Sequence, residues 1–436
     1  MRDIDSEGQS KVIEDIAERL EASYVFPEVA ELCNQHLRSE FAAGAFKDIT
    51  RQETFAQALT TALQSISNDK HMRVTFEPER VRVQEADPLE SQLEQYREQR
   101  DRNFGFEQVK ILEDNVGYVE MRAFAPIEYG RETAAAAMGF LANTNAIIFD
   151  LRRNGGGSPE MVQFICSYFF HERTHLNSLY FRESDTTTEY WTIPDVPGRP
   201  LPDIPLYVLT SEYTFSAAEE FTYNLSTRGR ATLVGETTGG GANPGGQVSV
   251  GEGFLMFIPT GRAINPITGT NWEGVGVPPD IESKASQALD LALSEARKAG
   301  REYREFQNSE QDYLWAEYHS SLQTAEAKFE DGQAEAAVKI VESALRTGRA
   351  GGIFDEATIN FLGHSQLGGE KYDLAIAILN FNANAFPSSS NAWGSLGEAH
   401  MAKGETAQAI ESYGKSLELD PHNANAIERL RRLKQG

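Results

Sequence analysis

The chain has 436 residues, 40% of them hydrophobic, so it is long enough for two or three domains with sizeable cores. Its 65 acidic and 40 basic side chains give a net charge of -25, which argues against nucleic acid or an anionic membrane surface as a partner. No run reaches the roughly 18 apolar residues of a membrane span. The two cysteines, Cys33 and Cys166, are too few for a disulfide framework and lack metal-ligand spacing.

The first part of the chain has the periodicity of helices. Apolar residues recur every three or four positions over residues 9–67, which predicts a three-helix bundle or lid. The run Thr50–Glu53 has the form of a capping box that opens the third helix. The period changes to two over His71–Phe76, which indicates a strand with His71 at its entrance. Residues 80–105 are dense in charge and are expected to form a solvated connector.

Strands and helices alternate between residues 106 and 283, which indicates an α/β core. The strand predicted at 146–151 is fully apolar and should therefore be central in its sheet. The other predicted strands are 117–122, 206–209, 231–234, 254–258 and a pair around 186–195, and the helices are 131–141, 159–170 and the segment after Ser216.

A repeat follows the core. Residues 281–317 are helical and charged, and from about residue 318 matched positions recur at the tetratricopeptide period of about 34 residues, as between Pro387 and Pro421. Trp393 and Tyr413 fall where that repeat pattern expects them. The C-terminal region is therefore predicted to be an array of about three helical hairpins.

Ser216 lies between an apolar strand and a helix with acids in its first turn. A serine on such a turn presents its hydroxyl at a helix N-terminus, where the next N–H and the helix dipole stabilise a developing oxyanion. An ordinary N-cap is the alternative explanation, since serine is favoured at that position.

A nucleophilic serine needs a base, and the chain offers few candidates. Of eight histidines, seven lie on predicted helices or polar helix ends, whereas His71 stands at a strand edge directly after a loop. No lysine occurs between Lys110 and Lys284, so a lysine near the serine is not available as the base.

The candidate oxyanion donors are the backbone N–H groups of Ala217 and of the run Asn154–Gly157. Glycines after a central strand let the backbone approach a ligand closely. A plain flexible turn is the alternative for these glycines. They do not form a phosphate loop, because no Gly-Lys-Ser/Thr follows them.

Four blocks of the sequence occur in the order seen in tail-specific (C-terminal processing) serine peptidases: Phe149–Gly157, Thr210–Glu219, Val234–Gly239 and Glu273–Asp280. The segment Asn68–Val74 is similar to the branch that includes interphotoreceptor retinoid-binding protein and the tricorn core protease. The resemblance covers about residues 10–300. It implies a crotonase/ClpP-like ββα-type α/β core behind an N-terminal three-helix bundle, without a PDZ domain, and the repeats add a C-terminal all-α tetratricopeptide superhelix.

Carried over position by position, the resemblance makes Ser216 the nucleophile and His71 the general base. It assigns the oxyanion hole to the backbone N–H groups of Gly156 and Ala217. Glu273 matches the acid that completes the tricorn-type tetrad.

Two positions separate this chain from its relatives. The other branch of the family places a lysine where this chain has Gly241, so the resemblance implies the Ser–His version of the chemistry. Tricorn-type enzymes place a serine before the histidine, where this chain has Lys70. Glu273 is therefore expected either to pair with Lys70 or to contact His71 directly.

The resulting prediction is a serine-type peptidase that cleaves protein or peptide substrates, C-terminal tails among them, without a metal or other cofactor. The alternatives are a non-catalytic binding module for apolar ligands and a protein-interaction scaffold. The predicted domains are 1–78 (bundle and the His71 strand), 79–300 (peptidase core), 301–317 (helical connector) and 318–436 (repeats).

The repeats are expected to bind a protein or a second subunit. The family implies a periplasmic or extracellular location. The first residues contain no apolar stretch of the kind found in an export signal, so the cytoplasm is the alternative.

Overall fold

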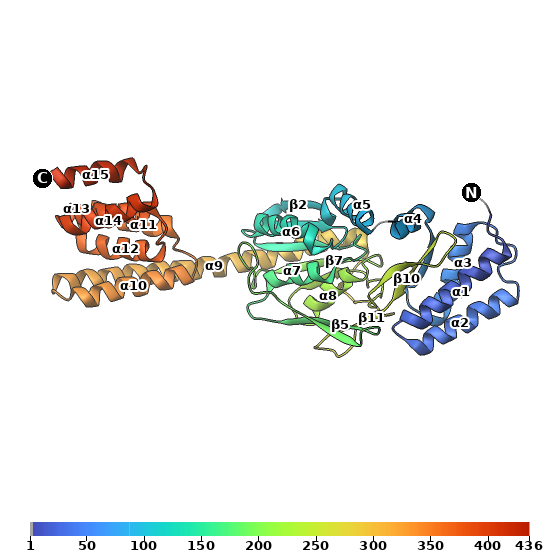
Figure 1. Cartoon of the computed structure of the whole chain (residues 1–436). Coiled ribbons are helices and arrows are strands. Elements are labelled where there is room, and N and C mark those ends of the chain that lie inside the picture. The colour runs from blue at the N-terminus through green and yellow to red at the C-terminus, as the bar shows by residue number, and fades with distance from the viewer. Residues whose placement is uncertain (1–2, 87, 436) are drawn as a thin grey trace. The chain divides into compact units, whose positions relative to one another are not determined.

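The computed structural model describes residues 3–86 and 88–435 (Figure 1). The chain divides into two compact units, residues 1–303 and 304–436. The boundary falls inside α9 (Ala285–Glu330), a single helix of 46 residues. The finer division into four domains stays a prediction.

The first unit begins with the predicted three-helix bundle, formed by α1 (Ser6–Ser23), α2 (Pro27–Ala42) and α3 (Gln52–Ser67). The predicted capping box is wrong. Arg51 is the N-cap residue of α3 and makes no side-chain cap, while the Thr50 carbonyl accepts the N–H of Ile4 at 2.8 Å. The Thr50 carbonyl is thus hydrogen-bonded to Ile4, and Thr50 lies one residue before the N-cap position of α3.

The charged segment after the bundle is helical rather than a plain connector. It contains α4 (Pro78–Ala86) and α5 (Pro88–Asp101). Where exposure is described, its charges lie mostly on exposed helix surface, as in the i,i+3 pair of Arg82 with Glu79 at 2.9 Å. The density of charge correctly predicted that this segment is exposed. It did not predict that the segment is helical.

A six-stranded sheet forms the centre of the unit, in the order β12-β8-β7-β4-β3-β2. All neighbours are parallel except β2, which runs antiparallel to β3 at one edge. The strands are β2 (Phe106–Leu112), β3 (Val116–Met121), β4 (Ala146–Asp150), β7 (Leu206–Thr210), β8 (Thr232–Gly235) and β12 (Ile281–Glu282).

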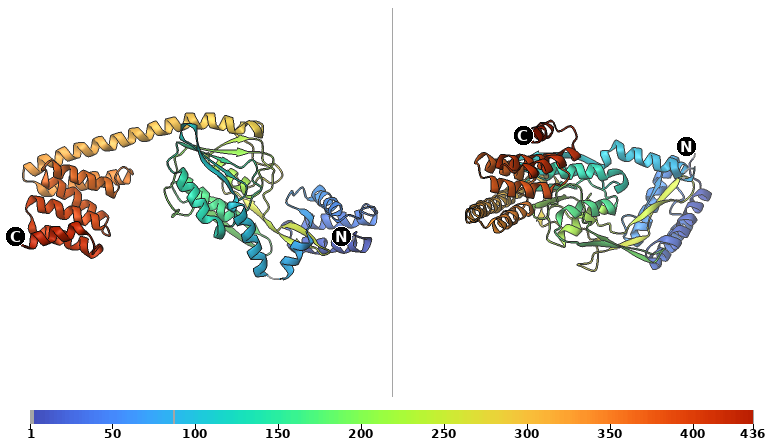
Figure 2. Two further views of the ribbon diagram at one scale, coloured as in Figure 1. Left: turned by 90° about the horizontal axis from the view of Figure 1, so that it is seen from above. Right: turned by 60° about the vertical axis from the view of Figure 1, so that its left-hand side comes forward.

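Helices cover both faces of this sheet, which explains why β4 is apolar at every position before its last residue, Asp150. Ile147 and Phe149 belong to the core under α6 (Ile127–Leu141), α7 (Pro159–Cys166) and α8 (Ala217–Ser226). Ala146 and Ile148 pack with alanines of α9 on the opposite face (Figure 2). Successive side chains of a strand point to opposite faces, so a central strand must be apolar on both.

Two three-stranded sheets complete the unit, β1-β10-β9 and β11-β5-β6. Their strands are β1 (Arg73–Phe76), β5 (His175–Phe181), β6 (Thr186–Trp191), β9 (Gly245–Ser249), β10 (Phe254–Pro259) and β11 (Gly261–Ile264). The first of these sheets packs on the bundle, with Met72, Val74 and Phe254 in a common core with α1–α3. The antiparallel pairing of Arg73 with Phe257 fixes where the chain before β1 lies.

The second unit consists of helical hairpins with their own cores. After α9 come α10 (Ala334–Ala350), α11 (Glu356–Gly368), α12 (Tyr372–Ala385), α13 (Ser390–Lys403), α14 (Thr406–Leu419) and α15 (Ala424–Gln435). Tyr413 is fully buried, as a repeat-packing residue should be. Among the described residues, the helices include none that is long and apolar enough to cross a membrane.

Candidate active site

Ser216 occupies the turn between β7 and α8, at the N-cap position of α8. Its backbone has φ 57° and ψ −122°, a conformation that residues other than glycine rarely adopt. An ordinary N-cap residue is extended, so capping alone does not account for this geometry. Strain of this kind persists where surrounding contacts enforce it, and it is common at functional turns.

Those contacts come from Glu219, a carboxylate with no exposed surface in the first turn of α8. Its Oε2 accepts the N–H groups of Ser216 and Gly241, both at 2.8 Å. Its Oε1 accepts the hydroxyl of Thr238 at 2.5 Å and the N–H of Gly240 at 2.6 Å. Burial raises the pKa of Glu219, and the four hydrogen bonds oppose that rise. One side chain therefore ties the glycine-rich loop to the Ser216 turn.

His71 lies directly before β1, with 9% of its surface exposed. Its ring packs against Phe215, the residue before Ser216, at 4.5 Å between centroids, and stacks on Phe257 at 5.3 Å. Within the described part of the chain neither ring nitrogen has a hydrogen-bond partner, so no bond to Ser216 is formed in this state. Burial, and secondarily the charge of Arg73, lowers the pKa of His71 to about 4, which keeps the imidazole neutral at pH 7.

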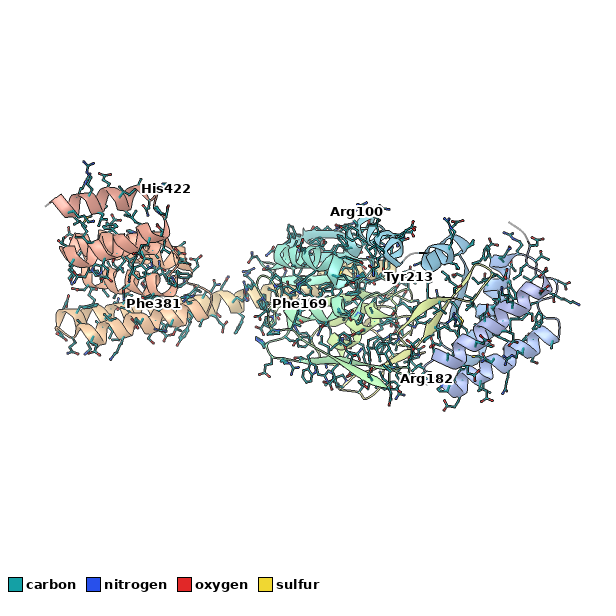
Figure 3. All side chains as sticks on the ribbon, viewed as in Figure 1. Arg100, Phe169, Arg182, Tyr213, Phe381 and His422 are labelled. Carbon is teal, nitrogen blue, oxygen red and sulfur yellow. The ribbon has the colours of Figure 1, made fainter. Side chains whose placement is uncertain are left out.

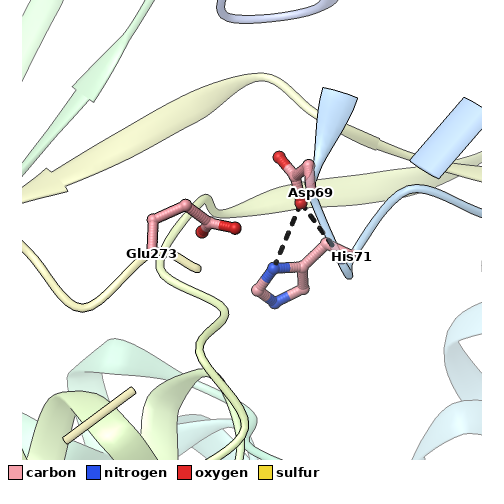
Figure 4. A group of neighbouring side chains, drawn as sticks. All are labelled: Asp69, His71 and Glu273. Carbon is pink, nitrogen blue, oxygen red and sulfur yellow. Dashed lines mark hydrogen bonds and ion pairs between the residues drawn. The ribbon is translucent and has the colours of Figure 1, made fainter. Parts of the chain in front are cut away.

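Two acids flank His71 (Figure 4). Asp69, which the sequence reasoning missed, is 1% exposed, and its Oδ1 accepts the His71 N–H at 3.0 Å and lies 3.9 Å from Nδ1. Glu273 accepts the N–H of Ala242 at 2.5 Å through Oε2. Potential ligand atoms of Asp69, His71 and Glu273 all lie within 4.8 Å of one another, a spacing that a cation could also bridge.

Lys70 lies apart from this group. Its Nζ donates to the Gly239 carbonyl at 2.6 Å. Among the described residues no ion pair joins Lys70 to Glu273, and direct contact of Glu273 with His71 stays a prediction. The lysine instead joins the segment before β1, which carries His71, to the glycine-rich loop.

The predicted oxyanion residues lie beside Ser216. A Cβ added at Gly156, whose φ is 110°, would come 2.7 Å from Ser216 Cβ and 3.1 Å from the nitrogen of Ala217. The Gly156 N–H donates to Oδ1 of Asn154 at 2.9 Å. Asn154, fully buried and not singled out individually in the sequence, also donates to the Met121 carbonyl at 3.1 Å, which anchors the glycine turn to β3.

Comparison with known proteins identifies the parts of the chain. Residues 115–283 match peptidase family S41, and residues 6–107 match the N-terminal domain of Peptidase S41 in eukaryotic IRBP. Residues 390–423 match the tetratricopeptide repeat.

Similar solved structures include three peptidases. A putative peptidase from Parabacteroides merdae is 17% identical, with a TM-score of 0.46, over 66% of this chain and 96% of that one. The photosystem II D1 C-terminal processing protease is 14% identical, with a TM-score of 0.39, over 64% and 93%. The tricorn protease is 12% identical, with a TM-score of 0.42, over 68% and 37%.

The family matches cover both the sheet that carries Ser216 and the bundle that leads to His71. The chain is a serine-type peptidase that contains a family S41 peptidase domain, an IRBP-like N-terminal domain and a C-terminal tetratricopeptide repeat.

Proposed function

We propose that this peptidase hydrolyses peptide bonds of protein or peptide substrates with Ser216 as nucleophile and His71 as general base. The strained turn of Ser216 carries the proposal, because it presents a hydroxyl at the N-terminus of α8. The contact of the His71 ring with Phe215 brings the base to the same turn.

In the proposed reaction, the Ser216 oxygen attacks the scissile carbonyl while His71 takes the hydroxyl proton. His71 then returns the proton to the leaving amine, and water repeats the cycle on the acyl-enzyme. The N–H groups of Ala217 and Gly156 stabilise the oxyanion. Because Gly156 now donates to Asn154, the oxyanion must replace that acceptor.

Exposed apolar side chains beside the site favour a peptide substrate. Tyr213, three residues before Ser216, is 65% exposed (Figure 3), and Val275, two residues after Glu273, is 72% exposed. By contrast, a cavity of about 490 Å³ at the strand ends is lined by charged residues such as Arg122, Asp150 and Arg152. This charged cavity does not suit the apolar ligand of a carrier protein, whereas smaller cavities beside Phe140 and beside Phe76 have more apolar linings.

Labelling with a fluorophosphonate probe tests the function without a known substrate. The wild type should be labelled, and Ser216→Ala should not. Ser226→Ala, at the other end of α8, is the matched control and should be labelled like the wild type. Equal labelling of the wild type and Ser216→Ala would sink the assignment.

The pH dependence should reflect the buried base. Since His71 must be neutral to accept a proton and its pKa is lowered to about 4, activity should persist below the usual histidine pKa of about 6.5. The midpoint of the acid limb of kcat/KM against pH should lie between about 4 and 6.5, because an ionised Asp69 beside the ring opposes the effect of burial. A midpoint above 6.5 would contradict the burial of a neutral His71.

The repeat unit favours an additional role in binding a protein partner, because stacked helical hairpins present extended binding surfaces. Removing residues 304–436 should leave hydrolysis of a short peptide within about twofold of the full chain, since every proposed catalytic group lies in the first unit. Loss of short-peptide hydrolysis in a folded truncated protein would instead favour the scaffold alternative.

A further inference from the structure

The surroundings of His71 place two carboxyl groups where a Ser–His peptidase needs one. Asp69 Oδ1 contacts the His71 backbone and faces Nδ1, the ring nitrogen that an orienting acid contacts when the other nitrogen serves the nucleophile. Asp69 is itself fixed, because its Oδ2 accepts the side-chain amide of Asn243 at 2.9 Å and the hydroxyl of Tyr24 at 3.4 Å. A buried, held carboxylate on the Nδ1 side has the geometry of a positioning group.

Glu273 is held differently. Oε2 is bound by the Ala242 N–H, whereas Oε1 is buried without a partner among the described residues. An ionised oxygen without a donor is costly in such a place, but a protonated one can donate to a nearby acceptor. Asp69 is the candidate acceptor, since side-chain oxygens of the two acids lie within 4.8 Å of each other, and a small shift of either side chain would bring them into hydrogen-bond range.

We propose that Asp69 positions His71 for catalysis and shares a single proton with Glu273, an inference that rests on the function proposed above. Two carboxylates this close, away from water, cannot both be ionised at neutral pH without a cation between them. The nearest lysine, Lys70, donates to a backbone carbonyl instead. The pair then carries one negative charge, placed on Asp69 beside His71.

The charged and titratable neighbours of the pair agree with this distribution. Burial and the charge of Asp69 raise the pKa of Glu273 to about 8, and burial also raises the pKa of Asp69. The other titratable groups that face the pair and His71 are Tyr24, Cys33, Glu219 and Arg73. Tyr24 and Cys33 have raised pKa values and stay neutral, Glu219 adds negative charge on the Glu273 side, and Arg73 adds positive charge on the His71 side.

The experiment measures the second-order rate constant of fluorophosphonate labelling from pH 5 to pH 10. In the wild type, ionisation of the second carboxyl near pH 8 adds negative charge beside His71 and favours the imidazolium that forms during attack. The rate should therefore rise in a step near pH 8. Glu273→Gln should lack that step, and in Asp69→Asn the step should move to lower pH, because Glu273 stays buried but no longer titrates against the charge of Asp69.

The two variants should differ in rate. At pH 7, Asp69→Asn should be slower than wild type by about 100-fold or more, because the imidazole loses its orienting charge, and Glu273→Gln by about tenfold or less. Asp150→Asn, which removes another buried acid, is the control and should keep both the rate and the step. Thermal unfolding checks that each variant is folded.

A step that stays near pH 8 in either variant, or a Glu273→Gln enzyme slower than Asp69→Asn, overturns the inference. If Asp69→Asn does not fold, the labelling rate of Glu273→Gln decides alone. A rate as low as that of a variant without His71 would make Glu273 the orienting acid and exclude the proposal. Absence of Ser216 labelling in the wild type would instead contradict the proposed function, so the two failures are distinguishable.

Discussion

Replacing His71 by leucine should lower kcat/KM for a peptide substrate by about 10³- to 10⁴-fold while leaving the fold intact, because the general base is lost. Leucine is apolar and of similar volume, so it can fill the space between Phe215 and Phe257. Neither ring nitrogen of His71 has a partner to lose among the described residues. The free energy of unfolding should therefore change by less than about 1.5 kcal/mol.

His175→Leu is the matched control. Nε2 of His175 bonds Ser178 at 2.9 Å, and the ring stacks on Trp191 at 4.5 Å. This substitution should cost about 1 kcal/mol or more of stability and leave activity near that of the wild type. Peptide hydrolysis and urea unfolding measured on both variants give the comparison. If His71→Leu stayed active, or if both variants lost activity equally, His71 would not be the base.

The contrast between these two histidines shows what the sequence could supply. His71 could be selected from eight histidines because it stands at a predicted strand edge and lies in a segment that resembles the family. Both signals are local in the sequence. The lack of partners for its ring nitrogens could not be predicted. It results from packing of the ring against Phe215 and Phe257, which come from distant parts of the chain. Sequence spacing carries no signal for such packing.

The acid beside His71 illustrates the same limit. Glu273 could be predicted because it stands in a recognisable block, whereas Asp69 was passed over although it lies two residues before His71. Its significance comes from Asn243, 174 positions away, whose amide fixes the carboxylate. An acid just before a strand is most often a turn residue, and only the tertiary contact distinguishes it.

In the fold, strongly periodic elements were predicted well and weakly patterned ones were missed. The strands β2, β9, β11 and β12 were not predicted. β2 is an edge strand with mostly exposed or partly exposed side chains, so it lacks an apolar signature. β11 is only four residues long and begins at Gly261, which reads as part of a turn.

The second prediction with a large expected effect concerns Glu219. Its role in holding the Ser216 turn depends on its negative charge rather than on its shape. Glu219→Gln should lower the free energy of unfolding by about 2–4 kcal/mol, since buried groups lose their partners. Either orientation of the amide sets its NH₂ group against fixed donors, the N–H groups of Ser216 and Gly241 or that of Gly240. Displacing the Ser216 turn by about 1 Å should cost about 100-fold in rate.

Glu220→Gln, at the next position of α8, is the control that separates burial from ionisation. Burial raises the pKa of Glu220 to about 8, well above its value in the unfolded chain, so the folded protein holds a proton there up to that pH. The wild type thus loses stability from Glu220 as pH rises from the unfolded pKa of 4.5 to about 8, and loses no more above that pH. Glutamine carries no such proton, so Glu220→Gln should already be more stable than the wild type at pH 6, and by a larger margin at pH 9.

Urea unfolding at pH 6 and pH 9, with probe labelling at pH 7, therefore distinguishes the two neighbouring acids. If Glu219→Gln were as stable and active as Glu220→Gln, the carboxylate would not hold the Ser216 turn, and its strain would need another source. If Glu219→Gln lost both properties while Glu220→Gln lost neither, the reason would be electrostatic. Four donors converge on Glu219, and only an anion accepts all of them at once.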